Sequence, residues 1–354
     1  MDRDVIDDEN LPLSRKSRLP GEGFFILEEV RERERDQEAA DALEGAEVAV
    51  IADADADGLA CVALIQWARG EAALLPAGPH DLENAMERVV EFGRADLDVF
   101  VCDLAPDRYE YVGDELEALL AQGATVTWYD HHQWDDDVAD AVRDAGVDLV
   151  VGDSEEECTA DVVVRSMDVA FPPYLTELAV VTRDHDLWIK EDPRSDDLAD
   201  YAYWSEAEEY VETVREHGAE LPDGVEAFLT EQRIEKEALI ERAIDRARFV
   251  DIGEWTVGVT YGRCSQNEVA EGMREQGADA SVIVKPAGSA SIRGSETFER
   301  CHEVAKQVNG GGHPRAAGCK PDIYDDMLDY AQHWVTEGAV AQRRILAGFE
   351  TLLK

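Results

Sequence analysis

The sequence predicts an α/β protein in which a doubly wound, mostly parallel sheet is followed by a smaller α/β domain. Short apolar runs alternate with helical patterns such as residues 59–69 and 109–122. Strands that alternate with helices form parallel sheets with helices on both faces. A second set of strands begins after residue 252. Four runs in the first region have the length of buried strands: residues 48–51, 99–102, 125–129 and 149–151.

The segment before the first strand is charged. Residues 1–22 contain Pro12 and Pro20 and predict a flexible arm. Residues 24–44 interleave Glu and Arg at helical spacing, which predicts a helix with a solvated face. We therefore expect an arm and helix over 1–45, the sheet domain over 46–200, a helical linker over 201–250 and the second domain over 251–345.

The second domain has its own sequence of elements. Its apolar runs are short, as in strands, and its last predicted helix leads into a glycine-rich turn. We expect strands at 255–261, 281–285 and 290–293, and helices at 266–276 and 297–308.

The chain is strongly acidic. Its 354 residues carry a formal net charge of -47, from 33 basic and 80 acidic side chains. We interpret this as a solvated surface suited to high salt, since at molar salt the Debye length is about 3 Å and self-repulsion is screened. Acidic tails are the weaker explanation, because the acid runs along the whole chain. Bulk charge would not attract nucleic acid, so such binding needs a local patch and metal ions.

The cysteines and the apolar segments restrict the class of protein further. The six cysteines are scattered, with no C-x-x-C spacing, which predicts buried free thiols and no zinc site. The acidic N-terminus lacks the apolar region of a signal peptide, and no run of about 18 apolar residues exists. We expect a cytoplasmic protein without a membrane partner. The oligomeric state is left open, with a homodimer as one option.

Acidic and imidazole side chains follow the predicted strands. Asp53, Asp55 and Asp57 leave the first strand at alternate positions. An acidic turn before a helix would look the same, but three close carboxylates carry raised pKa values unless a cation neutralises them. Such hard oxygen ligands suit Mn²⁺ or Mg²⁺. The second strand ends at Asp103, which a helix cap would also explain.

The third strand ends in Asp130, His131 and His132. His131 can bind a metal, Asp130 can orient an imidazole ring, and His132 can protonate a leaving group. A capping Asp followed by two surface His is the alternative. A fourth acidic cluster lies in a predicted loop, where either Asp184 or Asp186 could be a ligand.

The carboxyl ends of parallel strands meet at one edge of a sheet, so these groups should converge. Six such ligands without a cation would be electrostatically costly, and two divalent ions about 3.5–4 Å apart would satisfy them. Asp103 is placed to bridge the two ions. The predicted ligands are Asp53, Asp55, Asp57, Asp103, His131 and Asp184.

The second domain contains a glycine triplet, Gly310 to Gly312, followed by His313, Pro314 and Arg315. Glycines let backbone N–H groups approach an anion, and a His or Arg can contact phosphate. A turn that closes a helix is the alternative. Residues 285–320 hold six Lys or Arg against three Glu, an informative balance in so acidic a chain. Arg293 would face the same ligand. The alternative is that Arg293 is a surface arginine on an edge strand without a ligand.

These motifs, in their order and spacing over residues 46–345, resemble the DHH phosphoesterase family. Asp130, His131 and His132 match its name-giving motif, and the Gly310–His313 segment resembles the signature of its associated C-terminal domain. The resemblance implies a catalytic domain with two Mn²⁺ or Mg²⁺ ions, Mn²⁺ being preferred, and a C-terminal domain that binds substrate across a cleft. Many members have a His where Asp53 stands.

The resemblance also implies the roles of individual residues, with Asp130 and His132 catalytic. Asp53, Asp55 and Asp184 would hold one ion, Asp57 and His131 the other, and Asp103 would bridge. His132 would contact the scissile phosphate. The implied substrate-binding residues are Arg293, Gly311, Gly312 and His313. We add Arg315, because its guanidinium can contact phosphate.

The implied activity is hydrolysis of a phosphodiester in single-stranded nucleic acid, an oligonucleotide or a nucleotide. The family includes exonucleases that resemble RecJ and nucleases for very short RNA. Alternatives are a cyclic-dinucleotide hydrolase, a 3′-phosphoadenosine 5′-phosphate hydrolase and a catalytically silent binding module. A soluble pyrophosphatase shares the DHH motif but lacks the glycine signature.

Overall fold

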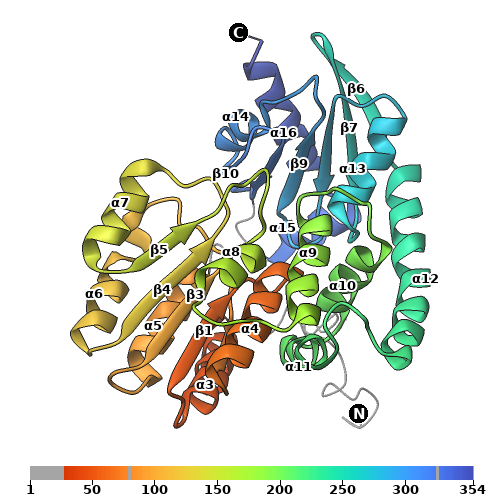
Figure 1. Ribbon diagram of the computed structural model, residues 1–354. Helices are drawn as coiled ribbons and strands as arrows, with labels where there is room; N and C mark the ends of the chain where they lie inside the picture. The colour runs from red at the N-terminus through yellow and green to blue at the C-terminus, as the bar shows by residue number, and fades with distance from the viewer. Residues whose placement is uncertain (1–27, 79–80, 324–326, 354) are drawn as a thin grey trace, which may run out of the picture. The chain divides into compact units, whose positions relative to one another are not determined.

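The computed structural model describes residues 28–78, 81–323 and 327–353. The chain divides into two compact units, Met1–Leu229 and Thr230–Lys354, and the boundary falls inside helix α12 (Asp223–Asp245) (Figure 1). The expected arm at 1–22 lies outside the described residues. The helix expected at 24–44 is present as α3 (Glu28–Leu43).

The first unit contains a five-stranded sheet of order β2-β1-β3-β4-β5, and every strand pair in it is parallel. The predicted doubly wound parallel sheet is therefore confirmed. Strand β2 was not predicted, because its four residues end at a proline and give a short apolar signal. The strands are β1 (Val48–Ala52), β2 (Ala73–Pro76), β3 (Asp98–Cys102), β4 (Thr125–Asp130) and β5 (Asp148–Val151).

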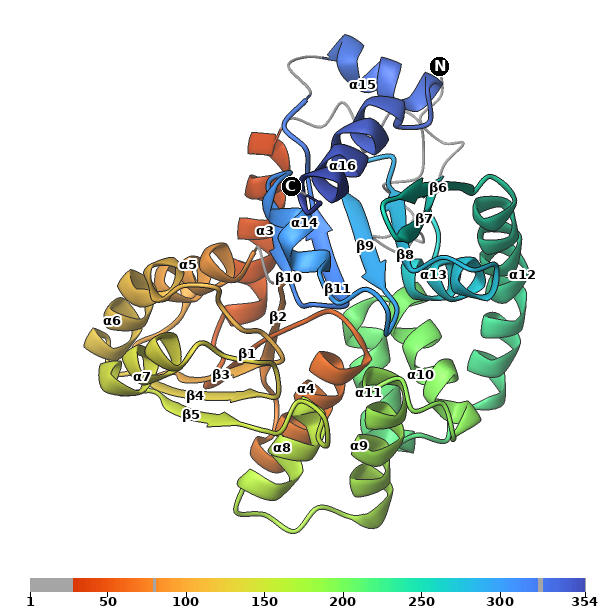
Figure 2. The same cartoon turned by 90° about the horizontal axis from the view of Figure 1, so that it is seen from above.

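Helices cover both faces of this sheet, as Figure 2 shows for α5 and α6 on one side and α4 and α8 on the other. Alternate residues of each strand enter opposite cores. Ala49 and Ile51 pack in the core on the α5 side, whereas Val48 and Val50 pack in the core on the α4 side. The helices are α4 (Ala56–Arg69), α5 (Leu82–Phe92), α6 (Gly113–Ala121) after a 3₁₀ turn (Tyr109–Tyr111), α7 (Asp136–Ala145), α8 (Thr159–Ser166), α9 (Pro173–Asp186), α10 (Pro193–Trp204) and α11 (Ala207–His217).

The strand order reverses direction between β1 and β3. Strand β1 is followed along the sheet by β2 on one side and by β3 on the other. In open α/β sheets, ligands bind beyond the carboxyl ends of the strands at this switch point. The residues that leave β1 and β3 are therefore placed at the usual ligand position of the fold.

The second unit contains a six-stranded mixed sheet of order β10-β11-β9-β8-β7-β6, in which only β7 and β8 are parallel among the described pairs. Helix α13 and the end of α12 cover one face, while α14 and α16 cover the other. The elements are β6 (Arg248–Ile252), β7 (Trp255–Tyr261), α13 (Gln266–Glu275), β8 (Ala280–Val284), β9 (Ala290–Gly294), α14 (Cys301–Lys306), β10 (Gly310–Gly312), β11 (Ala316–Cys319), α15 (Met327–Val335) and α16 (Ala339–Thr351).

Three expectations differ from the structure. The 201–250 segment is not a separate linker, because α11 packs in the core of the first unit and β6 opens the second sheet. The glycine-rich turn is a strand, β10, that pairs antiparallel with β11. The helix expected at 297–308 is shorter, since α14 covers only Cys301–Lys306.

The six cysteines are free thiols, five of them buried, as the scattered spacing predicts. None of the helices within the described ranges is long and apolar enough to cross a lipid bilayer.

Candidate metal centre

The segment after β1 brings three carboxylates to the switch point. Asp55 is the N-cap of α4, where its Oδ1 accepts hydrogen bonds from the backbone N–H groups of Asp57 (3.0 Å) and Gly58 (3.1 Å). Capping of this kind satisfies N–H groups that have no partner within the helix. Asp55 is exposed, Asp53 is partly buried and Asp57 is buried. The cap thereby fixes the turn from which the neighbouring acids project.

Gly58 allows the close approach of this turn to the helix. A Cβ at Gly58 would lie 2.3 Å from the carbonyl oxygen of Asp53 and 2.8 Å from its nitrogen. We expect G58A to displace the turn and to lower the free energy of unfolding by about 1–3 kcal/mol, because overpacking against backbone cannot relax locally.

The matched control is G224A in α12, where a Cβ meets no atom within 4 Å. Thermal melting and Mn²⁺ binding of both variants measure the effect. Metal binding by G58A equal to that of the unmodified chain would contradict this account of the turn.

Asp57 and Asp103 are joined by Thr159, the first residue of α8. The Asp57 carboxylate accepts hydrogen bonds from the N–H groups of Thr159 (2.6 Å) and Ala160 (2.9 Å). The Thr159 hydroxyl donates to Oδ1 of Asp103 (2.8 Å). The start of α8 thus orients two buried carboxylates that leave neighbouring strands. Sequence reasoning missed Thr159, which gives no signal because it follows Asp57 by about a hundred residues.

His131 lies between Asp103 and Asp186. Its Nε2 is 3.6 Å from Oδ1 of Asp103 and 3.3 Å from Oδ2 of Asp186. Ligand atoms of Asp57, His131 and Asp186 all lie within 4.8 Å of one another, and so do those of Asp103, His131 and His132. His131 is common to both groups.

Asp184 does not join this cluster, although the sequence favoured it as the ligand. Residues 184–186 close helix α9 and do not form the expected loop. The buried Asp184 carboxylate accepts hydrogen bonds from the Ser195 hydroxyl (2.7 Å) and from the N–H groups of Glu191 (2.9 Å) and Asp192 (3.2 Å). Two residues along a helix are about 200° apart, so Asp184 and Asp186 face opposite ways. The structure places Asp186 at the candidate site.

His132 is held by Asp130. Its Nδ1 hydrogen-bonds to Oδ1 of Asp130 (2.8 Å), while Oδ2 of the same fully buried carboxylate accepts from Nε1 of Trp134 (2.6 Å). Burial alone would lower the pKa of His132, but the hydrogen bond to Asp130 and the surrounding carboxylates raise it to about 9. His132 is therefore an imidazolium at neutral pH in the metal-free chain.

Burial and mutual repulsion keep several of the acids protonated in the metal-free chain. Burial, followed by repulsion from Asp55, raises the pKa of Asp53 to about 7. Burial, followed by repulsion from Asp57, raises the pKa of Asp186 to about 8 and that of Asp103 well above its usual range. A bound cation would favour the ionised form of these carboxyl groups and displace their protons.

The metal-free protein should lose stability as the pH rises. The raised pKa values mean that Asp53 and Asp186 keep protons in the folded state that the unfolded chain has released. Stability therefore falls between about pH 4, their ordinary pKa, and pH 8. His132 acts in the same direction, because its stabilising proton is lost as the pH passes about 9.

The measurement is thermal melting in EDTA from pH 5 to pH 9, with D186N as the comparison. We expect the melting temperature to fall with pH and to fall less in D186N. A melting temperature that rises from pH 5 to pH 8 would contradict the raised pKa values.

The donor set fits a divalent cation. Among the described residues, the buried Oδ2 of Asp186 and Nδ1 of His131 have no hydrogen-bond partner. Carboxylate oxygens with one or two imidazole nitrogens are ligands suited to Mn²⁺ and Mg²⁺. Of the predicted ligands, Asp57, Asp103 and His131 belong to the two groups that share His131. Asp53 and Asp55 lie in the turn that precedes Asp57, and their carboxylates accept hydrogen bonds from backbone N–H groups of that turn.

The predicted substrate residues of the second unit lie on and beside the β10–β11 hairpin. A Cβ at Gly311 would meet no atom within 4 Å, whereas one at Gly312, whose φ is +131°, would lie 2.7 Å from the carbonyl oxygen of Ala316. The N–H of the exposed His313 donates to that same carbonyl (2.7 Å). The hairpin geometry thus requires glycine at position 312 and leaves open space over Gly311.

The two predicted arginines of this unit have protein partners. Arg315 is exposed, and its Nη2 lies 2.6 Å from Oε1 of Glu299. Nε of Arg293 donates to Oδ1 of Asn267 (2.7 Å), and its Nη1 donates to the carbonyl oxygen of Ile292 (3.2 Å). Arg293 sits on β9, which pairs with the hairpin strand β11. An anion that binds Arg315 would have to compete with Glu299.

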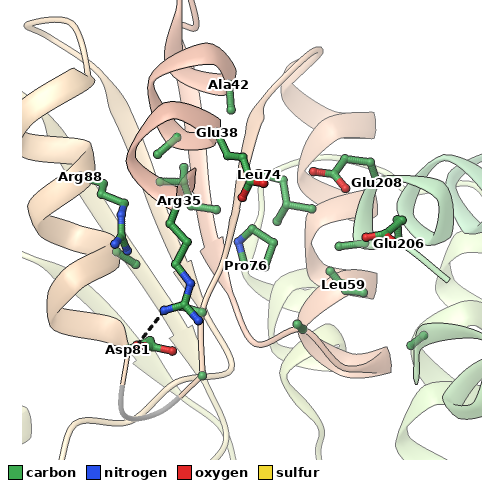
Figure 3. A pocket seen from close by; sticks show the side chains of 18 of the residues that line it. Arg35, Glu38, Ala42, Leu59, Leu74, Pro76, Asp81, Arg88, Glu206 and Glu208 are labelled. Atoms are coloured by element: carbon green, nitrogen blue, oxygen red, sulfur yellow. Dashed lines mark ion pairs between the residues drawn. The ribbon is translucent and has the colours of Figure 1, made fainter. Parts of the chain in front are cut away.

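A cavity of about 590 Å³ lies beside the acidic turn, since Ala54 is one of its lining residues. Figure 3 shows Arg35 directed toward Asp81, with Nη1 3.6 Å from Oδ1, and Glu206 and Glu208 on the opposite side. Two arginines and four acidic residues line it. The cavity wall therefore offers a phosphate no net attraction, and cations bound at the acidic cluster would have to supply the positive charge.

Solved structures of RecJ share this fold. Exonuclease RecJ bound to manganese matches over 88% of this chain and 94% of that chain, with 17% sequence identity and a TM-score of 0.53. RecJ from Thermus thermophilus in complex with Mn²⁺ matches over 88% of this chain and 55% of that chain, with 16% identity and a TM-score of 0.53. A pGpG-specific phosphodiesterase from Vibrio cholerae matches with 13% identity over 83% of this chain and 99% of that chain, at a TM-score of 0.47. No family model matches the sequence, and no curated protein matches it.

Proposed function

We propose that this chain, which shares its fold with RecJ structures, is a metal-dependent phosphodiester hydrolase of the DHH type. Its substrate would be single-stranded nucleic acid or a short oligonucleotide. The observation that carries the proposal is the convergence of Asp57, Asp103, His131 and Asp186 at the switch point of the sheet. Manganese in the RecJ structures supports Mn²⁺ as the ion, with Mg²⁺ as the alternative.

The ligands can be assigned to two ions. Asp57, His131 and Asp186 would hold one ion, Asp53 and Asp55 would hold a second, and Asp103 would contribute to both. Two bound divalent ions would activate a water molecule and neutralise the charge on the phosphoryl group. Thr159 orients Asp57 and Asp103 for this role, since it donates to both carboxylates.

His132 is proposed as the general acid. Its Nδ1 is occupied by Asp130, so Nε2 is the nitrogen that can donate a proton to the leaving oxygen. The partly exposed ring keeps a route to solvent, while Asp130 is fully buried. Asp130 would act as a positioning residue, because Trp134 and His132 use both of its oxygens.

Residues of the second unit are proposed to bind the substrate. Gly311, Gly312, His313 and Arg293 gather on β9 and the hairpin. The open space over Gly311 would allow an anion to approach the backbone closely. Arg315 would contribute if the substrate displaced Glu299 from its guanidinium.

The test is a Mn²⁺-dependent hydrolysis assay with labelled dinucleotides, longer single strands, cyclic dinucleotides and 3′-phosphoadenosine 5′-phosphate. We expect cleavage of short linear strands that stops in EDTA and resumes when Mn²⁺ is added. Cleavage of cyclic dinucleotides or of 3′-phosphoadenosine 5′-phosphate alone would reassign the substrate within the same chemistry. No cleavage of any substrate by the folded, Mn²⁺-loaded chain would identify a binding module and overturn the proposal.

A further inference from the structure

A second candidate site lies in the second unit, in a cavity of about 310 Å³. Pockets for small molecules usually measure about 300–1,000 Å³. The end of α12, the residues that follow β7, and the α15–α16 connection form its wall. The polar and aromatic lining residues are Arg242, Arg246, Arg263, Tyr261, Trp334 and Glu337.

The charge of this cavity opposes that of the chain. Three arginines and one glutamate line it, in a protein with 80 acidic and 33 basic residues. Arg242 lies in the last turn of α12 and Arg246 directly follows the helix, and both line the cavity. The general acidity of the protein surface does not explain why three arginines line the same cavity.

The guanidinium of Arg246 is held in place mainly by a carbonyl group, and its acidic partner lies at a long distance. Nη1 of Arg246 donates to the carbonyl oxygen of Tyr261 (3.3 Å), and its Nη2 is 3.9 Å from Oε1 of Glu337. A carbonyl orients a guanidinium but carries no net charge. Arg246 therefore keeps attraction for a phosphate, which guanidinium groups bind through paired hydrogen bonds.

The aromatic rings of the cavity are also held in position. Nε1 of Trp334 donates to the carbonyl oxygen of Pro286 (2.9 Å), and the side chain remains 38% exposed. The Tyr261 ring contacts His333 edge to face, with ring centroids 5.6 Å apart. Exposed, oriented rings next to arginines are the usual means of binding a nucleobase together with its phosphate.

This cavity is separate from the hairpin of the same unit. Strands β7 and β8 end at Tyr261 and Val284, which pair with each other, and Val284 pairs with the first residue of β9, Ala290. Arg293 and the turn of the hairpin, residues 313–315, lie where β9 ends, beside the start of β8. Four residue steps of β8, about 13 Å, separate the two ends of the sheet.

We propose that this cavity is a nucleotide site, in which the arginines bind a phosphate and Trp334 or Tyr261 stacks on the base. The ligand would be a free nucleoside monophosphate or one nucleotide of a single strand. The site does not depend on whether the acidic cluster of the first unit is catalytic.

The test is calorimetric binding of AMP and of pentaadenylate to the full chain in EDTA at constant salt. The variant R242A/R263A removes two cavity arginines, and R343A/R344A removes two exposed arginines of α16 as a control for charge. We expect R242A/R263A to weaken binding by about tenfold or more, and R343A/R344A to stay within about twofold.

The two ligands distinguish the sources of the nucleotide. Weaker binding of AMP indicates a site for free nucleotide, and weaker binding of pentaadenylate alone indicates a site for a strand. No binding to the unmodified chain, equal binding by R242A/R263A, or an equal loss in R343A/R344A would overturn the proposal. If a melting experiment shows that R242A/R263A does not fold, R263K replaces it. Lysine keeps the positive charge but loses the paired hydrogen bonds, so we expect the same weakening of nucleotide binding.

Discussion

Replacement of Asp103 by Asn is expected to lower the turnover of phosphodiester hydrolysis about a thousandfold while the chain stays folded. Loss of a bridging carboxylate would weaken the binding of both ions. Two bound ions would together stabilise the charge of the transition state by several kcal/mol, and each 1.36 kcal/mol corresponds to a factor of about ten in rate. The amide oxygen of Asn can still accept the hydrogen bond from the Thr159 hydroxyl. Asn is the appropriate substitution because Asp103 has a φ of +62°, which Asn tolerates and Ala does not.

The effect on stability should have the opposite sign from the effect on rate. Burial and neighbouring carboxylates hold the pKa of Asp103 well above its usual range, so the metal-free chain already favours a neutral group at this position, which the amide supplies. We expect the melting temperature of D103N in EDTA to equal or exceed that of the unmodified chain. D107N, an exposed Asp four residues later, serves as the control. Turnover by D103N within tenfold of the unmodified chain would refute the bridging role.

Asp184 and Asp186 should give opposite phenotypes although only one residue separates them. D186N is expected to lower Mn²⁺ affinity and turnover at least a hundredfold without destabilising the metal-free chain, because burial and Asp57 raise the pKa of the wild-type carboxyl group and so favour a neutral group there. D184N is expected to keep Mn²⁺ binding and to lower the free energy of unfolding by about 1–3 kcal/mol. An amide group there cannot accept all three hydrogen bonds from Ser195, Glu191 and Asp192.

Each variant is the control for the other, since both remove one negative charge from the same helix. Mn²⁺ titration and thermal melting in EDTA separate the two effects. Loss of Mn²⁺ binding in D184N with normal binding in D186N would restore the sequence-based assignment and contradict the placement of Asp186.

The sheet and the residues that leave its strands could be predicted from the sequence. Strands β1 and β3 contain continuous, buried apolar runs, as expected for strands covered on both faces, and β4 and β5 are also rich in β-branched and aromatic residues. An acid that ends such a run must lie at the carboxyl edge of the sheet, which is how Asp53, Asp103 and the Asp130–His132 segment were found. Strand β2, four residues ending in Pro76, has no comparable pattern.

Side-chain direction on a helix could not be predicted in the same way. The apolar run before Asp184 and Asp186 fits a strand, a loop or a helix, and only the helix tells the two acids apart. The contacts of Thr159 depend on where α8 packs against the sheet, and the local sequence does not predict that position. The hairpin at Gly310–Gly312 was missed because glycine disfavours strands, and pairing with β11 outweighs that preference here.

Calorimetric titration of the EDTA-treated full chain with Mn²⁺ tests the central claim most directly. Molar potassium chloride in the buffer suppresses weak binding by the many surface carboxylates. We predict two ions per chain for the unmodified protein and for D107N, and weakened binding in D103N and D186N. If the unmodified chain binds no Mn²⁺, or if D103N and D186N bind Mn²⁺ as well as the unmodified chain does, these side chains do not hold a pair of metal ions.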